Sequence, residues 1–226
     1  MLLKRCPVCP PQSENSGANM KLTIALAGNP NCGKTTMFNN LTGAHQHVGN
    51  WPGVTVERKS GIVNFDVKGC QKGEVEVIDL PGTYSLSPFS RDEVVAADYL
   101  VDGNPDCILN IVDGTNLNRN LYLTTQLVEL GIPVVIAINM IDVVKKRGDS
   151  INIPKLSAKL GVPVVEVSAI SGEGLRKAIE ECRDAVEHKL LPAKQRIFSD
   201  SVANALANIE KTLPQNIDHI RVLAVK

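Results

Sequence analysis

The stretch that decides the fold is GNPNCGKTT, residues 28–36. It follows the short apolar run KLTIALA at 21–27 and leads into GKTTMFNNLTG, which we expect to be a helix that ends at Gly43. The pattern Gly28-x-x-x-x-Gly33-Lys34-Thr35 is typical of a loop whose backbone N–H groups bind phosphate ahead of a helix N-terminus. The sequence therefore predicts that Lys34 reaches the β- and γ-phosphates and that the Thr35 hydroxyl ligates Mg²⁺.

Length and composition fit one α/β domain with a smaller second piece. The chain has 226 residues and 43% hydrophobic residues, and its 24 basic and 24 acidic side chains give a formal net charge of zero. Because nucleic-acid proteins usually carry a basic excess, we expect no nucleic-acid partner. The apolar runs fall short of the roughly 20 residues that span a bilayer, so we expect a soluble, intracellular chain whose parent protein can still be membrane-anchored.

Apolar runs alternate with helical patterns along the chain. Strands are expected at 21–27, 54–66, 74–78, 106–113, 133–140 and 163–169, and helices at 33–43, 91–101, 119–131, 153–161 and 174–188. The fold class is therefore α/β, with a mostly parallel six-stranded sheet, one antiparallel strand and helices on both faces. The polar segment 44–53 is expected to be a loop.

The expected domain boundaries follow from the same pattern. We interpret residues 1–19 as a disordered extension, 20–188 as the nucleotide-binding domain, and 189–226 as a linker with the start of a truncated helical domain. The six cysteines show no disulfide framework. Cys6 and Cys9 have metal-ligand spacing but no second ligand pair nearby, so we expect no zinc site there.

Three further motifs each end an expected strand. DLPG at 79–82 places Asp79 to hold Mg²⁺ through a water and the Gly82 N–H to bind the γ-phosphate. NMID at 139–142 provides Asp142, whose carboxylate can accept hydrogen bonds from N1–H and the amino group of guanine, and adenine offers neither donor there. SAISG from Ser168 offers the Ala169 N–H to the guanine carbonyl oxygen. Together with the phosphate loop these motifs indicate a GTP-binding domain, so we expect the α/β fold of a Ras-like P-loop GTPase.

The segment between the first two motifs should contain a switch loop. We expect the Thr55 hydroxyl to sense Mg²⁺ and the γ-phosphate, with the loop changing between order and disorder upon hydrolysis. The residues expected to contact nucleotide are Gly28, Asn29, Pro30, Asn31, Cys32, Gly33, Lys34, Thr35, Thr36, Gly53, Val54, Thr55, Asp79, Leu80, Pro81, Gly82, Asn139, Met140, Asp142, Ser168, Ala169 and Ile170. Trp51 is expected to be a packing residue or a partner contact, and Cys32 a tolerated small residue rather than a redox switch.

Long stretches of this sequence resemble the cytosolic domain of the FeoB family of bacterial ferrous iron transporters. They are GNPNCGKTTMFNNLTGAHQHVGNWPGVTVERKSG, DLPGTYSLSPFSRDE and VDGTNLNRNLYLTTQLVELGIPVVIAINMIDV, within about residues 20–188. The resemblance implies slow GTP hydrolysis that regulates Fe(II) uptake at the cytoplasmic face of the inner membrane. It also implies a helical domain that slows GDP release, a transmembrane permease region, small Feo accessory proteins as partners, and a possible homo-oligomer.

Two departures from other GTPases bear on the chemistry. Thr83 follows DLPG, where many relatives carry a glutamine that orients water, so the transition-state charge must be stabilised otherwise. In families similar to this one, K⁺ supplies that charge, and the resemblance implies that Asn31 and the backbone carbonyls of Gly49 to Trp51 hold it. The expected catalytic residues are thus Asn31, Lys34, Thr55 and Gly82. Met140 replaces a common lysine, which should weaken nucleotide binding.

Two alternatives within guanine-nucleotide use, and one outside it, remain open at this point. One is a nucleotide-dependent conformational switch with negligible catalysis, which the sequence does not separate from a slow GTPase. The other is a related GTPase in RNA modification or ribosome assembly, which would be expected to carry a basic RNA-binding module. Adenine nucleotide use is a third possibility, and Asp142 argues against it.

Overall fold

The computed structural model describes residues 21–43, 45–66 and 72–192. The side chains of Phe65, Asp66 and Lys72 are not described within that set. Predictions that concern residues 1–19, including Cys6 and Cys9, and most of 189–226 fall outside the described residues, so those domain boundaries stay predictions.

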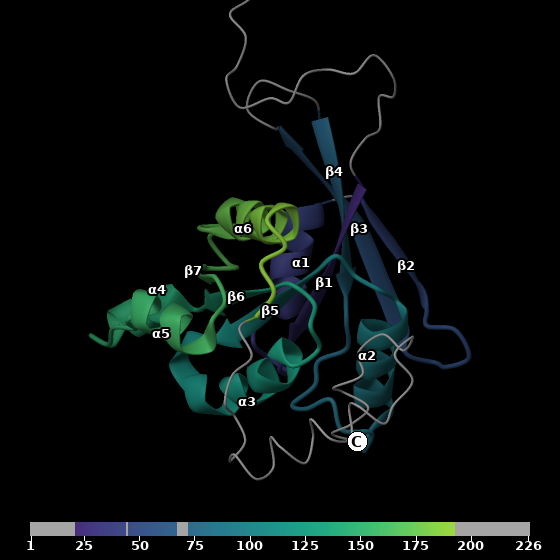
Figure 1. The fold of residues 1–226 in the computed structure, drawn as a ribbon, viewed down its shortest axis with the longest axis horizontal. Helices are drawn as coiled ribbons and strands as arrows, with labels where there is room; N and C mark the ends of the chain where they lie inside the picture. Colours follow the sequence, from purple (N-terminus) through teal and green to yellow (C-terminus); the bar gives the residue numbers. More distant parts are fainter. Residues whose placement is uncertain (1–20, 44, 67–71, 193–226) are drawn as a thin grey trace, which may run out of the picture.

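A seven-stranded sheet forms the centre of the described fold (Figure 1). Its order is β2-β3-β4-β1-β5-β6-β7, and β1, β4, β5, β6 and β7 are parallel while β3 is antiparallel to both of its neighbours. The strands are β1 (Lys21–Gly28), β2 (Gln46–Asn50), β3 (Glu57–Asp66), β4 (Lys72–Asp79), β5 (Cys107–Asp113), β6 (Val134–Asn139) and β7 (Val164–Glu166). Because β1 lies between β4 and β5, the carboxyl ends of all three strands meet beside the phosphate loop.

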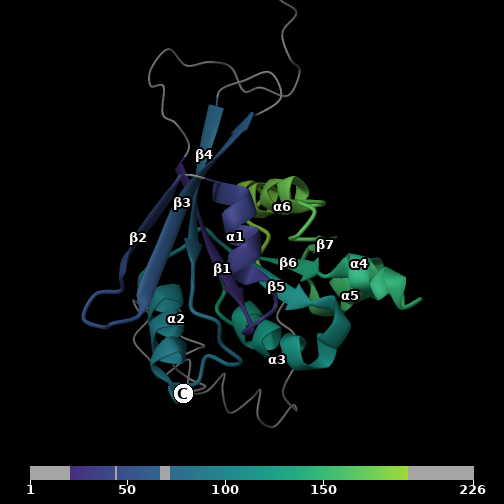
Figure 2. The same ribbon diagram turned by 180° about the vertical axis from the view of Figure 1, so that it is seen from behind.

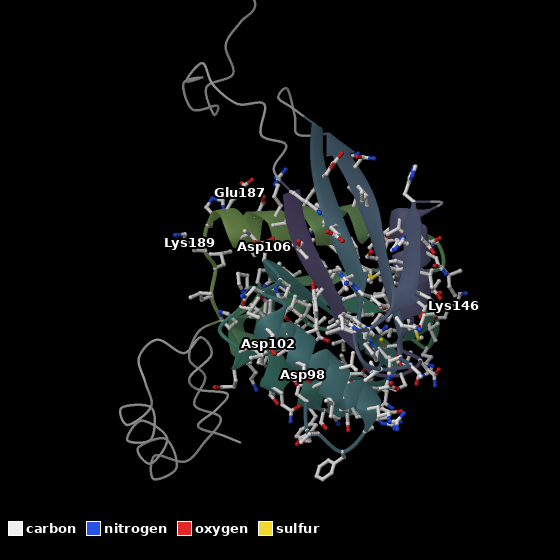
Figure 3. All side chains as sticks on the ribbon, turned by 90° about the vertical axis from the view of Figure 1, so that its right-hand side faces the viewer. Asp98, Asp102, Asp106, Lys146, Glu187 and Lys189 are labelled. Atoms are coloured by element: carbon white, nitrogen blue, oxygen red, sulfur yellow. The ribbon has the colours of Figure 1, made fainter. Side chains whose placement is uncertain are left out.

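Helices cover both faces of this sheet (Figures 1 and 2). They are α1 (Lys34–Thr42), α2 (Arg91–Asp102), α3 (Leu117–Val128), α4 (Ile141–Lys146), α5 (Ile153–Leu160) and α6 (Leu175–Glu187), with a 3₁₀ turn at Gly114–Asn116. In Figure 3, Asp98 and Asp102 mark α2 on one side of the sheet, and α1 lies on the other side.

The alternation of β1 explains the two layers. Leu22, Ile24 and Leu26 are buried in a cluster with side chains of α1 and α6. Ala25 and Ala27 point the other way, into a cluster with side chains of α2, α3 and α5. Since successive strand residues face opposite sides, the unbroken run of buried apolar residues 24–27 means that this part of β1 is buried on both faces. The short run at 21–27 therefore supports both layers of the core.

The predicted α/β fold with a mostly parallel sheet is confirmed, but the sheet has seven strands where six were expected. Residues 46–50 were expected in a loop, but they form the edge strand β2, antiparallel to β3 with Gln46 opposite Gly61. All five β2 residues are exposed. An edge strand held by backbone pairing alone has no buried face, so it leaves no hydrophobic alternation to detect. The short helix α4 was also not predicted, and β3 begins at Glu57 rather than at residue 54.

No helix among the described residues is both long and apolar enough to cross a membrane.

We predict that Leu109→Ala strongly destabilises this fold. Leu109 lies in the central strand β5 and is fully buried. Truncating a buried leucine removes transfer free energy and leaves a cavity, which costs about 2–5 kcal/mol. In a domain of this size that corresponds to a fall in Tm of about 5–15 °C, measured by thermal circular dichroism on the full chain.

The matched control is Val48→Ala in β2, whose side chain is 53% exposed. An exposed edge position should change stability by no more than about 0.5 kcal/mol. Equal losses for the two variants would contradict the assignment of β5 to the core and of β2 to an exposed edge.

Candidate functional site

The phosphate loop joins β1 to α1 in the predicted place. β1 ends at Gly28 and α1 begins at Lys34, with Gly33 in the left-handed region at φ 88°. Asn31 is also left-handed, at φ 64°, a conformation that asparagine tolerates better than most residues. The N-terminus of α1 has no side-chain cap and no acidic residue in its first turn. Its free N–H groups and positive dipole end therefore favour an anion at this loop.

Both loop glycines are required by close packing. A Cβ on Gly28 would lie 2.6 Å from the Ile111 carbonyl oxygen of β5 and 2.8 Å from the Cys32 sulfur. A Cβ on Gly33 would collide with the side-chain amide of Asn139. The spacing of these glycines thus reflects where neighbouring strands approach the loop, as well as its backbone conformation.

Lys34 forms a buried ion pair with Asp79 of the DLPG motif. The Lys34 ammonium contacts the Asp79 carboxylate, and both side chains are less than 10% exposed. The next residues continue along the loop: Leu80 N–H donates to the Leu26 carbonyl at 3.1 Å, and Thr83 N–H donates to the Gly28 carbonyl at 3.2 Å. The predicted association of the phosphate loop with DLPG is therefore present in the structure.

Gly82 lies directly against the loop. A Cβ at Gly82 would be 3.2 Å from the Cα of Pro30, so the backbones of these two segments nearly touch. This closeness is what an N–H that reaches the γ-phosphate would need. Whether the Gly82 N–H binds phosphate stays a prediction.

Asn139 connects three of the four motifs through one buried side chain. Its amide nitrogen donates to the Cys32 carbonyl at 2.8 Å, and its amide oxygen accepts from the Ala169 N–H at 2.8 Å. The residue is only 3% exposed. Because β6 ends at Asn139, the end of this strand fixes the phosphate loop on one side and the SAISG loop on the other.

The two predicted base-recognition segments, NMID and SAISG, both lie next to Asn139. Met140 is left-handed, at φ 62°, and turns the chain so that Asp142 lies half-buried in the first turn of α4. Ser168 and Ala169 are buried, whereas Ile170 is 84% exposed. The Asn40 amide of α1 also donates to the Ala169 carbonyl. Ala169 is therefore held at both its N–H and its C=O, which fixes the orientation of the loop that follows β7.

Cys32 is a buried packing residue. It is 1% exposed and belongs to the core cluster of α1 and α6. Burial raises the pKa of its thiol to about 11, against a smaller opposing effect from Lys34. The thiol is therefore neutral at physiological pH and is a poor nucleophile, which agrees with the interpretation of a tolerated small residue.

The predicted switch residues line one wall of a groove. Gly53, Val54 and Thr55 line a groove of about 860 Å³ together with Asn50 and Trp51 and with residues 88–91, 94 and 95, so its two walls come from segments 50–55 and 88–95. No contact of Thr55 with Thr35 or Asp79 is present among the described residues. Thr35 lies in the first turn of α1 and Asp79 ends β4, where it pairs with Lys34, the residue before Thr35. The joint Mg²⁺ set of Thr35, Thr55 and Asp79 stays a prediction.

Trp51 is buried beneath α2. Its ring centroid lies 5.0 Å from that of Tyr99, and the Arg58 guanidinium lies 5.2 Å from the ring. The indole is 6% exposed, and its N–H has no partner among the described residues. The packing interpretation of Trp51 therefore fits the structure, and this ring anchors the loop between β2 and β3.

The residues expected to hold K⁺ are spread across the sheet. Gly49 lies in β2 opposite Arg58 of β3, and β2 is three strands from β1. At about 4.8 Å per strand, roughly 14 Å separate β2 from the strand that carries the phosphate loop. The Trp51 carbonyl accepts from the Val54 N–H at 3.3 Å. The K⁺ set of Asn31 with the carbonyls of Gly49 to Trp51 stays a prediction.

The donor atoms of the loop nevertheless suit hard cations. Thr35 and Asp79 provide hydroxyl and carboxylate oxygens, the ligands that Mg²⁺ prefers. Asn31 is exposed in its left-handed position, so its amide oxygen is accessible beside the loop. These residues therefore fit an Mg²⁺ bound with phosphate and the start of a monovalent-cation site.

Three contacts at the site had no counterpart in the sequence-based prediction. Asn29, 3% exposed, donates its amide to the Arg119 carbonyl of α3 at 3.2 Å. The Arg119 guanidinium lies 4.2 Å from the Tyr84 ring centroid. Gln126 of α3 accepts from the Leu86 N–H at 2.7 Å. The stretch NLNRNLYLTTQL is part of the family resemblance given above. No pattern in it predicts that α3 contacts both the phosphate loop and the segment after DLPG.

Comparison with known proteins agrees with this geometry. The family model of ferrous iron transport protein B matches residues 22–182. A fusion of Fe(2+) transport protein A with the transporter FeoB from Porphyromonas gingivalis is 54% identical over 156 residues, which are 68% of this chain and 18% of that protein. The Fe(2+) transporter FeoB of Shigella flexneri is 47% identical over 204 residues, 87% of this chain and 25% of that protein.

A solved structure gives the same result in three dimensions. A GDP-bound mutant of the S. thermophilus FeoB G-domain is 47% identical, with a TM-score of 0.83, and the match covers 91% of this chain and 77% of that one. The chain spans a quarter or less of the length of the two curated relatives. The family model matches most of the described residues, and the solved FeoB G-domain has the same fold at 47% identity. The chain therefore belongs to the ferrous iron transport protein B family and corresponds to its G-domain.

Proposed function

We propose that this chain binds and hydrolyses GTP and thereby regulates Fe(II) uptake by a longer transporter. The observation that carries the proposal is the bridge made by Asn139, which holds the phosphate loop, the NMID segment and the Ala169 loop in one arrangement. A phosphate-binding loop and a guanine-recognising carboxylate are useful together only if their separation is fixed, and this buried amide fixes it.

Guanine specificity is assigned to Asp142. Its carboxylate would accept from N1–H and the exocyclic amino group. The Ala169 N–H, which was expected to bind the guanine carbonyl oxygen, donates to the Asn139 amide oxygen in this structure, so it would have to be shared with the base or released from Asn139. Adenine leaves a carboxylate in this position without donors, and an unpaired polar group in a recognition site is strongly unfavourable. GDP in the S. thermophilus relative supports the same ligand class for this chain.

Hydrolysis is assigned to the phosphate loop and its cations. Mg²⁺, held by Thr35 and Asp79, would neutralise charge on the β- and γ-phosphate oxygens, and K⁺ beside Asn31 would add the charge that an arginine provides elsewhere. Thr83 is 4% exposed and its N–H is bonded to Gly28, so it does not present a side chain that could orient water. Lys34 and the Gly82 N–H would stabilise the transferring phosphate, and Thr55 would join them only after the switch loop moves.

The cellular role rests on the family. The relatives are Fe(2+) transporters several times longer than this chain. We propose a location at the cytoplasmic face of the bacterial inner membrane, with the permease region of the parent protein as the main partner and residues 189–226 leading into a helical domain. The fusion in P. gingivalis supports a small Feo accessory protein as a second partner. A homo-oligomer belongs to the same proposal, and the family match counts against a role in RNA modification.

The bridge made by Asn139 is tested directly by comparing nucleotide binding of the wild type with that of Asn139→Ala. Loss of both hydrogen bonds of the amide should weaken GDP binding by about 10- to 100-fold, at roughly 1 kcal/mol for each bond plus the groups left unpaired. Calorimetric titration with GDP and ADP measures it, with circular dichroism to confirm folding. A folded Asn139→Ala chain that binds GDP like the wild type would contradict the proposal.

We predict that Asp142→Asn changes base preference. Removing a carboxylate that accepts two hydrogen bonds should lower GDP affinity by about 10²–10⁴-fold, because bonds to charged groups contribute about 1.5–3 kcal/mol each. An amide at this position offers a donor, so xanthosine diphosphate should bind the variant better than GDP. The matched control is Asp149→Asn, an exposed acid just after α4, which should leave GDP affinity unchanged.

We predict that GTP hydrolysis is faster in K⁺ than in Na⁺ at equal ionic strength, and that Asn31→Ala removes the difference. Losing one stabiliser of transition-state charge should cost roughly 10²-fold in kcat. Asn64→Ala, an exposed asparagine in β3, is the control. Equal rates in the two salts, unchanged in Asn31→Ala, would contradict the K⁺ assignment. Turnover much slower than GDP release in both salts would favour the switch with negligible catalysis.

A further inference from the structure

Helix α3 contacts both the phosphate loop and the segment that follows DLPG. The Arg119 carbonyl accepts from the Asn29 amide of the loop at 3.2 Å. The Arg119 guanidinium stacks over Tyr84 at 4.2 Å from the ring centroid. About two helical turns further along α3, the Gln126 side chain accepts a hydrogen bond from the Leu86 N–H at 2.7 Å. A single helix thus touches the two segments that must stay aligned around the γ-phosphate.

We propose that Arg119 is a positioning residue for GTP hydrolysis. Its side chain holds segment 83–86 through the ring of Tyr84, and its backbone carbonyl holds the phosphate loop through Asn29. Thr83 completes the link, because its N–H donates to Gly28 at the start of the loop. This inference deepens the proposed function and rests on it. It assigns to α3 the task of keeping residues 82–86 in register with the phosphate loop.

The start of α3 is built as a rigid support. The buried Asn110 amide of β5 donates to the Thr124 hydroxyl at 2.6 Å. Asn120, 5% exposed, donates to the Asn116 carbonyl at 2.9 Å and accepts from the Asp113 N–H at 3.3 Å. A side chain can position another segment only if its own element is fixed. These buried polar contacts fix the turn of α3 on which Arg119 lies, next to the central strand of the sheet.

Arg119 is suited to this role by its surroundings. The ion pairs of the described residues do not include it, so its guanidinium is not committed to a carboxylate there. Tyr84 is 39% exposed, which leaves its ring face accessible. A guanidinium over a partly exposed ring favours the stacked arrangement by about two- to fivefold in population. The stack of Arg119 on Tyr84 adds little to the stability of the fold. It matters for turnover in our proposal because it holds residues 82–86 beside the phosphate loop.

The geometry allows a clean separation of side chain and backbone. Arg119→Ala removes the stack on Tyr84 and keeps the carbonyl that accepts from Asn29. We expect kcat for GTP hydrolysis in K⁺ to fall by about two- to fivefold, with the Kd values for GDP and for a non-hydrolysable GTP analogue within twofold of wild type. Arg119→Lys keeps the cation and should recover part of the loss. Arg176→Ala, an exposed arginine of α6, is the control with wild-type kcat.

A double-variant cycle distinguishes positioning from direct action on phosphate. Tyr84→Leu should lower kcat about as much as Arg119→Ala, and Tyr84→Phe should lose less because it keeps the ring. If Arg119 acts through Tyr84, the double variant Arg119→Ala with Tyr84→Leu is no slower than either single variant. If the two losses multiply, Arg119 acts independently of Tyr84 and the proposal is overturned.

Hydrogen exchange gives a readout that does not depend on turnover. The Leu86 amide, held by Gln126, should exchange faster in Arg119→Ala than in wild type, in the same GDP-bound chain. Unchanged exchange at residues 84–87 would overturn the positioning role. A wild type that does not hydrolyse GTP would instead count against the proposed function. Active wild type with multiplying losses, or with unchanged exchange, would overturn the role of Arg119 alone.

Discussion

The arrangement of the site depends on one buried amide at the end of one strand. Asn139 donates to the phosphate loop at Cys32 and accepts from the loop after β7 at Ala169, each at 2.8 Å. It occupies the place that a side chain at Gly33 would need, so the glycine and the asparagine require one another. Since both partners are backbone groups, their separation is set by hydrogen-bond length. The end of β6 thereby holds the loop at Cys32 and the loop at Ala169 at a fixed distance from one another.

The sequence predicted this part of the site well for a physical reason. All four motifs end apolar strands, and in a parallel sheet such ends meet at one edge. Once β1 was interpreted as a strand buried on both faces, the places of Lys34, Asp79 and Asn139 followed without knowledge of contacts. The contact of Lys34 with Asp79 shows that the ends of β1 and β4 do meet, although the sequence analysis assigned these two side chains to phosphate and Mg²⁺ rather than to each other. The bridge made by Asn139 was not predicted. Periodicity and strand order therefore predict where side chains meet whenever those side chains lie on the regular part of the sheet.

Other parts of the site had no such signal. The five residues of β2 are exposed, so their strand conformation depends on pairing with β3 rather than on any pattern of their own. The link from Asn29 to α3 uses the carbonyl of Arg119, and a backbone acceptor has no sequence signature. Asn40, which binds Ala169 from α1, looks like any exposed helical asparagine. Contacts between elements through backbone atoms were thus beyond prediction from one sequence, although the residues that make them lie in stretches already quoted.

The segment from β2 to β3 is held both by backbone pairing and by one buried side chain. β2 buries no side chain, so separating it from β3 gives up backbone pairing but little apolar surface. Trp51 at its end is different, because it is 6% exposed beneath Tyr99 and Arg58. Removing such a ring from its site costs about 1.5–3 kcal/mol of burial. A ligand shifts this equilibrium only by its differential affinity for the two arrangements. Any rearrangement that carries residues 49–55 away from this place must therefore gain more from its ligand than the burial of the Trp51 ring that it gives up. A ligand that makes no contact with these residues leaves the loop where Trp51 anchors it.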